Sequence, residues 1–214
     1  NAAMTHLRSA RHTVPMTAPA RSAPQHEASL AIKDLNQWLT ALERSGQVAG
    51  LAISVVQNNQ VLLQRGIGYA DASTHAPVTA DTVFRLASLS KAFASALAGL
   101  LVDEGVLSWD TRVSDLLPTF TLHNNNAGQQ LTVRNILSQR AGLPHNTYDH
   151  LLEADEPYPV LVEKLKEVPL ACPVGGCYGY QNISFSLIGD ITYAATGDFF
   201  YHQVEKRIFH PLAM

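Results

Sequence analysis

Ser88 and Lys91 are two residues whose types and spacing could do chemistry. They lie at the start of an apolar stretch with helical spacing, FRLASLSKAFASALAGLL, which runs from Phe84 to Leu101. One helical turn would place the hydroxyl beside the amine, because residues three positions apart share one face of a helix. A serine next to its own base is a candidate nucleophile for acyl transfer.

The setting of this pair favours the same chemistry. We expect Ser88 in the first turn of a helix, where free backbone N–H groups and the positive end of the helix dipole stabilise an oxyanion. Lys91 can activate a hydroxyl only in its neutral form, which apolar surroundings favour. We expect four side chains to supply those surroundings: Phe84, Leu86, Phe93 and Leu97. The alternative is a chance match, in which a capping serine and an exposed lysine share a helix.

A second candidate segment follows further along the chain, CPVGGCYGYQNISFSLIG from Cys172 to Gly189. It places the phenol of Tyr180 and the amide of Asn182 between a glycine-rich turn and a new amphipathic helix, a usual location for site residues. Taken singly, Tyr180 could pack on the core, and Asn182 could be a helix cap or a glycosylation acceptor.

The order of these segments resembles the serine β-lactamase and penicillin-binding-protein superfamily, in its class C β-lactamase and esterase branch. Five segments match in order and spacing: FRLASLSK, LSWDTRVSDLLP, TVRNILSQRAGLPH, YQNISFSLIGDI and RIFHPLAM. The resemblance covers residues 84–214 and is much more specific than any one of the segments alone.

The resemblance implies a role for each matching residue. Ser88 would be the acylated nucleophile, Lys91 its partner, and Tyr180 the general base and acid. Asn182 would bind a substrate amide and the Lys91 ammonium. Asn146 is a weaker substrate-binding candidate, because the class C pattern has the longer Gln there. No cofactor or metal is expected.

The resemblance also implies the fold class, which is α/β in the α+β sense. An antiparallel sheet flanked by helices would carry an all-helical subdomain. We expect the sheet to be incomplete, because the chain stops at Met214 where the family's chain turns back to complete it. The family's Lys-Thr-Gly or His-x-Gly motif is also absent from these 214 residues. The remaining C-terminal half of the same polypeptide, or a second chain, is therefore an expected partner.

A further departure lies at Gln139-Arg140-Ala141-Gly142, where the family more usually has His-x-Ser-Gly. We interpret this difference as structural rather than catalytic.

Composition narrows the function classes. A net charge of −3 and 46% hydrophobic residues predict a globular protein with no affinity for nucleic acid. No apolar run is long enough to span a bilayer.

Cys172 and Cys177 could pair in an oxidising compartment, and the sequence leaves that disulfide open. Two cysteines without a nearby His or second pair do not predict a metal site. We expect a periplasmic or secreted protein.

Periodicity predicts the organisation of the chain. Residues 1–28 are predicted to be a flexible leader. Residues 29–87 are predicted to form a helix over Ser29–Gln47 and then a hairpin over residues 50–68, which turns at Asn58-Asn59. Residues 88–214 read as the nucleophile helix, central and buried, and the helical subdomain. Short helices are predicted over residues 109–117, 132–138 and 159–168, with a polar loop at residues 124–126. Another helix is predicted to start at Asn182 or Ser184 and end near Gly197, and Asp198 is predicted to cap a last one that runs to about Phe209.

The sequence therefore predicts a serine hydrolase that acts through a Ser88 acyl-enzyme on a β-lactam, a D-amino-acid peptide or a small ester. The alternative is a non-catalytic penicillin-recognising or scaffolding protein of the same fold. An α/β-hydrolase is disfavoured, because no Gly-x-Ser-x-Gly elbow is present.

Overall fold

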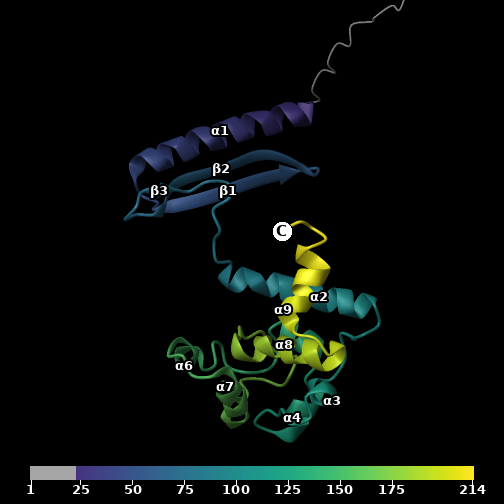
Figure 1. Cartoon of the computed structure of the whole chain (residues 1–214). Coiled ribbons are helices and arrows are strands. Elements are labelled where there is room, and N and C mark those ends of the chain that lie inside the picture. Colours follow the sequence, from purple (N-terminus) through teal and green to yellow (C-terminus); the bar gives the residue numbers. More distant parts are fainter. Residues whose placement is uncertain (1–22) are drawn as a thin grey trace, which may run out of the picture. The chain divides into compact units, whose positions relative to one another are not determined.

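The computed structural model describes residues 23–214, and the chain divides into two units, Asn1–Arg85 and Leu86–Met214 (Figure 1). In the first unit, α1 (Ala23–Ser45) is followed by three strands, β1 (Gly50–Gln57), β2 (Gln60–Asp71) and β3 (Ala76–Pro77). The strands form an antiparallel sheet in the order β1-β2-β3.

The β1–β2 hairpin confirms the predicted turn. Asn58 and Asn59 have φ angles of 50° and 60°, the left-handed conformation that a two-residue hairpin turn requires. Strand β2 continues past the predicted end, and β3 was not predicted.

Helix α1 packs along β2, and one side chain ties the two together. The Arg65 guanidinium donates to Asn36 Oδ1 at 2.9 Å, to Thr40 Oγ1 at 2.9 Å and to Glu43 Oε2 at 2.9 Å. Residues 23–28, which we assigned to the leader, form the first turns of α1. The other leader residues, 1–22, lie outside the described residues.

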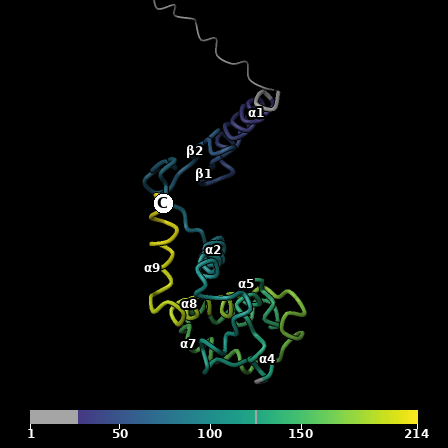
Figure 2. The backbone as a smooth tube through the Cα atoms, turned by 90° about the vertical axis from the view of Figure 1, so that its right-hand side faces the viewer, coloured from purple at the N-terminus to yellow at the C-terminus, as the bar shows by residue number. Residues whose placement is uncertain are grey.

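The second unit is helical. Its elements are a 3₁₀ turn η1 (Ala87–Leu89), α2 (Ser90–Asp103), α3 (Val113–Leu116), α4 (Asn125–Gln130), α5 (Val133–Leu137), α6 (Asp149–Glu153), α7 (Tyr158–Lys164), a 3₁₀ turn η2 (Leu165–Glu167), α8 (Ile183–Thr196), α9 (Phe200–Val204) and a π-helical turn η3 (Glu205–Phe209). Figure 2 shows the same backbone as a tube, turned by 90°.

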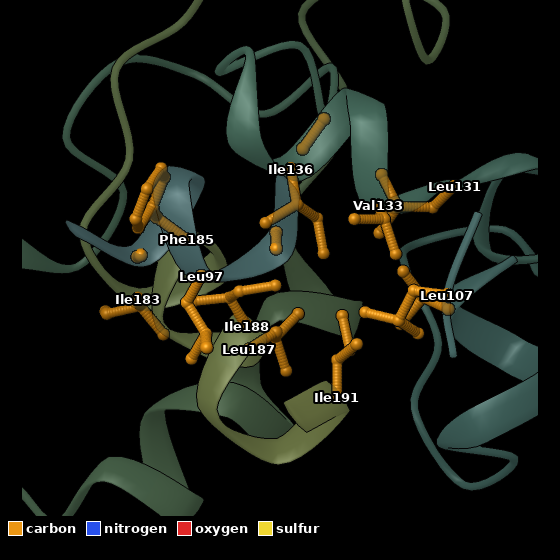
Figure 3. Packing of buried hydrophobic residues seen from close by; sticks show 14 of the residues in the cluster. Leu97, Leu107, Leu131, Val133, Ile136, Ile183, Phe185, Leu187, Ile188 and Ile191 are labelled. Atoms are coloured by element: carbon orange, nitrogen blue, oxygen red, sulfur yellow. The ribbon is translucent and has the colours of Figure 1, made fainter. Parts of the chain in front are cut away.

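Helix α8 is the centre of this unit, because α2, α3, α5, α7 and α9 all pack against it. Figure 3 shows Leu187, Ile188 and Ile191 of α8 among side chains from α2 and α5, including Leu97 and Ile136. We predicted that the nucleophile helix would be central. Helix α2 instead buries one face, on Ala94, Leu97, Ala98 and Leu101, and leaves Leu100 38% exposed.

Several predicted helices differ in extent from the observed ones. The helix predicted over residues 109–117 is only Val113–Leu116, and α6 was not predicted. The predicted loop at residues 124–126 is wrong, because Asn124 Oδ1 accepts from Ala127 N at 2.6 Å and caps α4. Thr132 and Asn135 form a capping box that starts α5 close to the predicted residue. No helix within residues 23–214 is both long enough and apolar enough to cross a membrane.

The packing of α2 on α8 predicts unequal costs for two leucines of one helix. Leu97 is fully buried, so Leu97→Ala should lower the free energy of unfolding by about 2–5 kcal/mol. Leu100→Ala, the matched control on the exposed side, should cost about 1 kcal/mol or less. Urea unfolding followed by circular dichroism measures both. Equal costs would contradict the assignment of the buried face.

Candidate active site

Ser88 lies in the 3₁₀ turn η1, immediately before α2, rather than in the first turn of the α-helix as predicted. The turn begins with Ala87 at a φ of 47°, a left-handed conformation that costs free energy in a residue other than glycine. Leu89 N donates to Leu86 O at 3.0 Å and closes the turn. The Ser88 side chain is exposed and lines a pocket.

The Ser88 hydroxyl contacts both predicted partners. Lys91 Nζ lies 3.3 Å from Ser88 Oγ, and the Tyr180 hydroxyl lies 2.7 Å from the same oxygen. Lys91 Nζ also donates to Asn182 Oδ1 at 2.7 Å. Four of the five predicted site residues therefore converge within hydrogen-bonding distance around one hydroxyl and one amine.

The surroundings of Lys91 differ from those predicted. Phe84 and Leu86 are 46% and 44% exposed, so they do not form an apolar wall around the amine. The rings of Tyr180 and Phe185 lie 4.9 and 5.4 Å from Nζ instead. The prediction counted neighbours in sequence, so it included two exposed side chains and missed the rings of Tyr180, just before α8, and Phe185, in the first turn of α8.

The position of the ammonium changes the acidity of the phenol. Hydrogen bonding with Lys91, and then with Ser88, lowers the pKa of Tyr180 below the ordinary value of a tyrosine. Both contacts favour the phenolate, and partial burial opposes them. A phenol that ionises more readily is better suited to accept a proton near neutral pH.

The backbone around Tyr180 is held by a buried pair of glutamines. Gln181 N donates to Gln139 Oε1 at 2.8 Å, and Gln139 Nε2 donates back to Gln181 O at 3.2 Å. Both residues are buried, at 7% and 0% exposure. Gln139 thus contacts the peptide between Tyr180 and Asn182, which supports a structural interpretation of its departure from the family's usual His.

Further contacts fix the same loop. Cys172 and Cys177 form a disulfide, which the sequence had left open. A Cβ at Gly179 would lie 2.6 Å from Leu143 O, so only glycine fits where the two loops meet. The loop that contains Leu143 and the loop that contains Gly179 are distant in sequence, and their contact positions Tyr180 beside Ser88.

Asn146 stands apart from the other predicted site residues. Its backbone N donates to Tyr180 O at 2.8 Å, but its side chain is exposed and is not among the described residues that line the pocket of Ser88. The structure therefore gives Asn146 a backbone contact with the site, and substrate binding by its side chain stays a prediction.

Asp149 is a neighbour of the site that the sequence reasoning missed. Its Oδ2 accepts from Asn182 Nδ2 at 2.8 Å. None of the five matching segments includes Asp149, and α6 is too short to show a period. The sequence signal was an acidic residue soon after the Leu-Pro of the third segment.

The pocket beside Ser88 has a volume of about 510 Å³. One part is polar, with Ser88, Lys91 and Asn182, and the other is formed by apolar side chains: Leu152, Phe185, Ile188 and Phe200. Within residues 23–214, no three His, Cys, Asp or Glu side chains come together as metal ligands. The donors and acceptors suit a small organic substrate.

Comparisons with known proteins agree with this geometry. The protein-family model described as Beta-lactamase matches residues 35–214. Penicillin-binding protein 4 of Amycolatopsis lactamdurans is 28% identical over 180 residues, which cover 81% of this chain and 45% of that protein. The solved class C beta lactamase from Rhodobacter sphaeroides is 28% identical with a TM-score of 0.68, over 87% of this chain and 49% of that one.

A D-amino acid amidase from Ochrobactrum anthropi SV3 is similar as well. It is 25% identical with a TM-score of 0.67, over 80% of this chain and 47% of that one. The chain thus spans less than half the length of each of these proteins.

The glutamine pair predicts a specific stability cost. Gln139→Ala removes both hydrogen bonds to the Gln181 backbone and leaves a buried N–H and C=O unpaired, so it should lower the free energy of unfolding by about 2–4 kcal/mol. Gln129→Ala, at an exposed position on α4, is the control and should change little. Thermal unfolding by calorimetry measures both, and an unchanged midpoint for Gln139→Ala would refute the role of the pair.

Proposed function

Because this chain belongs to the beta-lactamase family, we propose that it is the part of a serine hydrolase that forms an acyl-enzyme at Ser88. The substrate would be a β-lactam, a D-amino-acid peptide or a small ester. The observation that carries the proposal is the position of the Ser88 hydroxyl, 2.7 Å from the Tyr180 oxygen and 3.3 Å from Lys91 Nζ. Relatives named as a class C beta lactamase, a D-amino acid amidase and a penicillin-binding protein support the β-lactam and D-amino-acid substrates of this range.

In the acylation step, Ser88 Oγ attacks the substrate carbonyl carbon while its proton passes to the Tyr180 phenolate. Tyr180 then gives that proton to the leaving nitrogen or oxygen as its bond to the carbonyl carbon breaks. The Lys91 ammonium favours the phenolate and so supports the first transfer, in agreement with the lowered pKa of Tyr180.

The same groups act in reverse in deacylation. A water molecule loses a proton to Tyr180 and attacks the carbonyl of the Ser88 ester. The proton then returns to Ser88 Oγ as the acid product leaves, so the enzyme is regenerated. A protein that completes only the first step would be the penicillin-recognising alternative.

The proposal predicts covalent labelling at one residue. A fluorescent penicillin or a fluorophosphonate should add its mass to the wild-type chain and to Ser114→Ala, a control serine on α3, and should add none to Ser88→Ala. Intact mass spectrometry and peptide mapping measure the adduct. Labelling of Ser88→Ala, or none of the wild type, would overturn the nucleophile assignment. Labelling without release of product would favour the alternative.

A second prediction follows from the lowered pKa of Tyr180. The labelling rate constant of the wild type should rise with pH to a plateau, because the phenolate is the reactive base. The midpoint of this rise should lie below the ordinary phenol pKa of about 10. Lys91→Ala should move that midpoint upward, since the ammonium is the main cause of the shift.

Tyr180→Phe is the decisive variant for this pH dependence. It should lose the rising limb and slow labelling by roughly 10²- to 10⁴-fold. Rate constants are measured from pH 6 to pH 10 with correction for hydrolysis of the probe. The same limb in Tyr180→Phe would exclude Tyr180 as the base.

A further inference from the structure

Asn182 bridges two charged groups that come from different elements. Its Oδ1 accepts from Lys91 Nζ of α2 at 2.7 Å, and its Nδ2 donates to Asp149 Oδ2 of α6 at 2.8 Å. Asn182 and Lys91 line the pocket of Ser88. Asp149 is half-buried and contacts the amide from the other end.

The two charges allow only one orientation of the amide. If the amide were reversed, its NH₂ group would face an ammonium and its oxygen would face a carboxylate, and both contacts would be repulsive. An amide NH₂ has two N–H donors, and Asp149 takes one of them. A second donor is therefore left on the residue that lines the pocket.

We propose that Asp149 is a positioning residue that locks the Asn182 amide so that its second N–H serves the amide carbonyl of a substrate. The inference rests on the proposed function of the site. It narrows the substrate class to acyl compounds that carry an amide next to the scissile carbonyl, such as N-acylated D-amino-acid derivatives, in preference to simple esters.

The environment of Asp149 agrees with a role in the site. Within residues 23–214, its second oxygen, Oδ1, is buried and has no hydrogen-bond partner. Burying an oxygen without a hydrogen-bond donor lowers the stability of the fold, so a contribution to stability does not by itself explain a carboxylate at this position. Its one hydrogen bond, to Asn182, is strengthened by the low local dielectric.

Asp149 also occupies the first position of α6, where an acidic side chain can stabilise a helix start. The two roles differ in their effect on substrates. A helix-start role would lower stability and would affect all substrates equally, whereas the positioning role acts only on substrates with an amide. A matched pair of substrates therefore separates them.

The test compares two p-nitrophenyl esters that share a leaving group, an N-acetyl-D-alanine ester and a butyrate ester. Acylation rate constants come from the nitrophenol burst. Asp149→Ala should slow acylation by the N-acetyl-D-alanine ester roughly 10- to 100-fold and by the butyrate ester less than about 3-fold. Asp149→Asn keeps an acceptor for Asn182 and should fall between wild type and Asp149→Ala.

The control is Glu153→Gln, which removes a carboxylate from the exposed end of the same helix and should change neither ester. Equal losses on both esters, with a lower unfolding temperature, would assign Asp149 to the helix start and overturn the proposal. Unchanged rates on both esters would overturn it as well.

If wild type reacts with neither ester, the ester part of the proposed function fails, and a second measurement still tests Asp149. The side-chain amide NMR signals of Asn182 should move in Asp149→Ala and stay in place in Glu153→Gln. Unmoved signals in Asp149→Ala would overturn the locked orientation independently of any activity.

Discussion

The packing of α2 against α8 is the constraint on which the candidate site depends. Leu97 of α2 lies among Leu187 and Ile188 of α8, and each helix carries part of the site at its start. Lys91 is in the first turn of α2, and Asn182 directly precedes α8. A shift of one helix along the other would separate the ammonium from the amide oxygen 2.7 Å away. The apolar core thus sets the distance on which the polar contacts rely, because close-packed interiors resist such sliding.

Tyr180 is positioned differently, through the backbone of a loop. The Gln139–Gln181 pair, the close approach at Gly179 and the Cys172–Cys177 disulfide all act on residues beside Tyr180 rather than on its ring. The phenol oxygen itself lies 2.7 Å from Ser88 Oγ and is also influenced by the Lys91 ammonium. A general base that passes a proton from the nucleophile to the leaving group needs a fixed position and an oxygen that other contacts do not block. Contacts to the backbone beside Tyr180 fix its position and leave its oxygen accessible to the nucleophile.

How far the sequence could predict this structure depended on the kind of signal. The β-lactamase/transpeptidase-like fold was predicted correctly, because five motifs in order are specific where each alone is weak. Asn58-Asn59 identified the hairpin through its turn chemistry. The helix α4 was missed because its cap, Asn124, is also a typical loop residue. The walls around Lys91 and the contact from Asp149 depend on tertiary packing, which periodicity does not encode, so they could not be predicted.

The amide of Asn182 keeps the two charges of the site apart, and this separation matters for Tyr180. A direct Lys91–Asp149 ion pair would draw the ammonium towards the carboxylate and away from Ser88 and the phenol. With the amide between them, the ammonium is the largest influence that lowers the pKa of Tyr180, and the Asp149 charge, which raises that pKa, is the smallest of its causes. The carboxylate can therefore orient Asn182 without cancelling the field that favours the phenolate. An amide can fix the orientation of its neighbours but carries no net charge, so it is well suited to the position between the Lys91 ammonium and the half-buried Asp149 carboxylate.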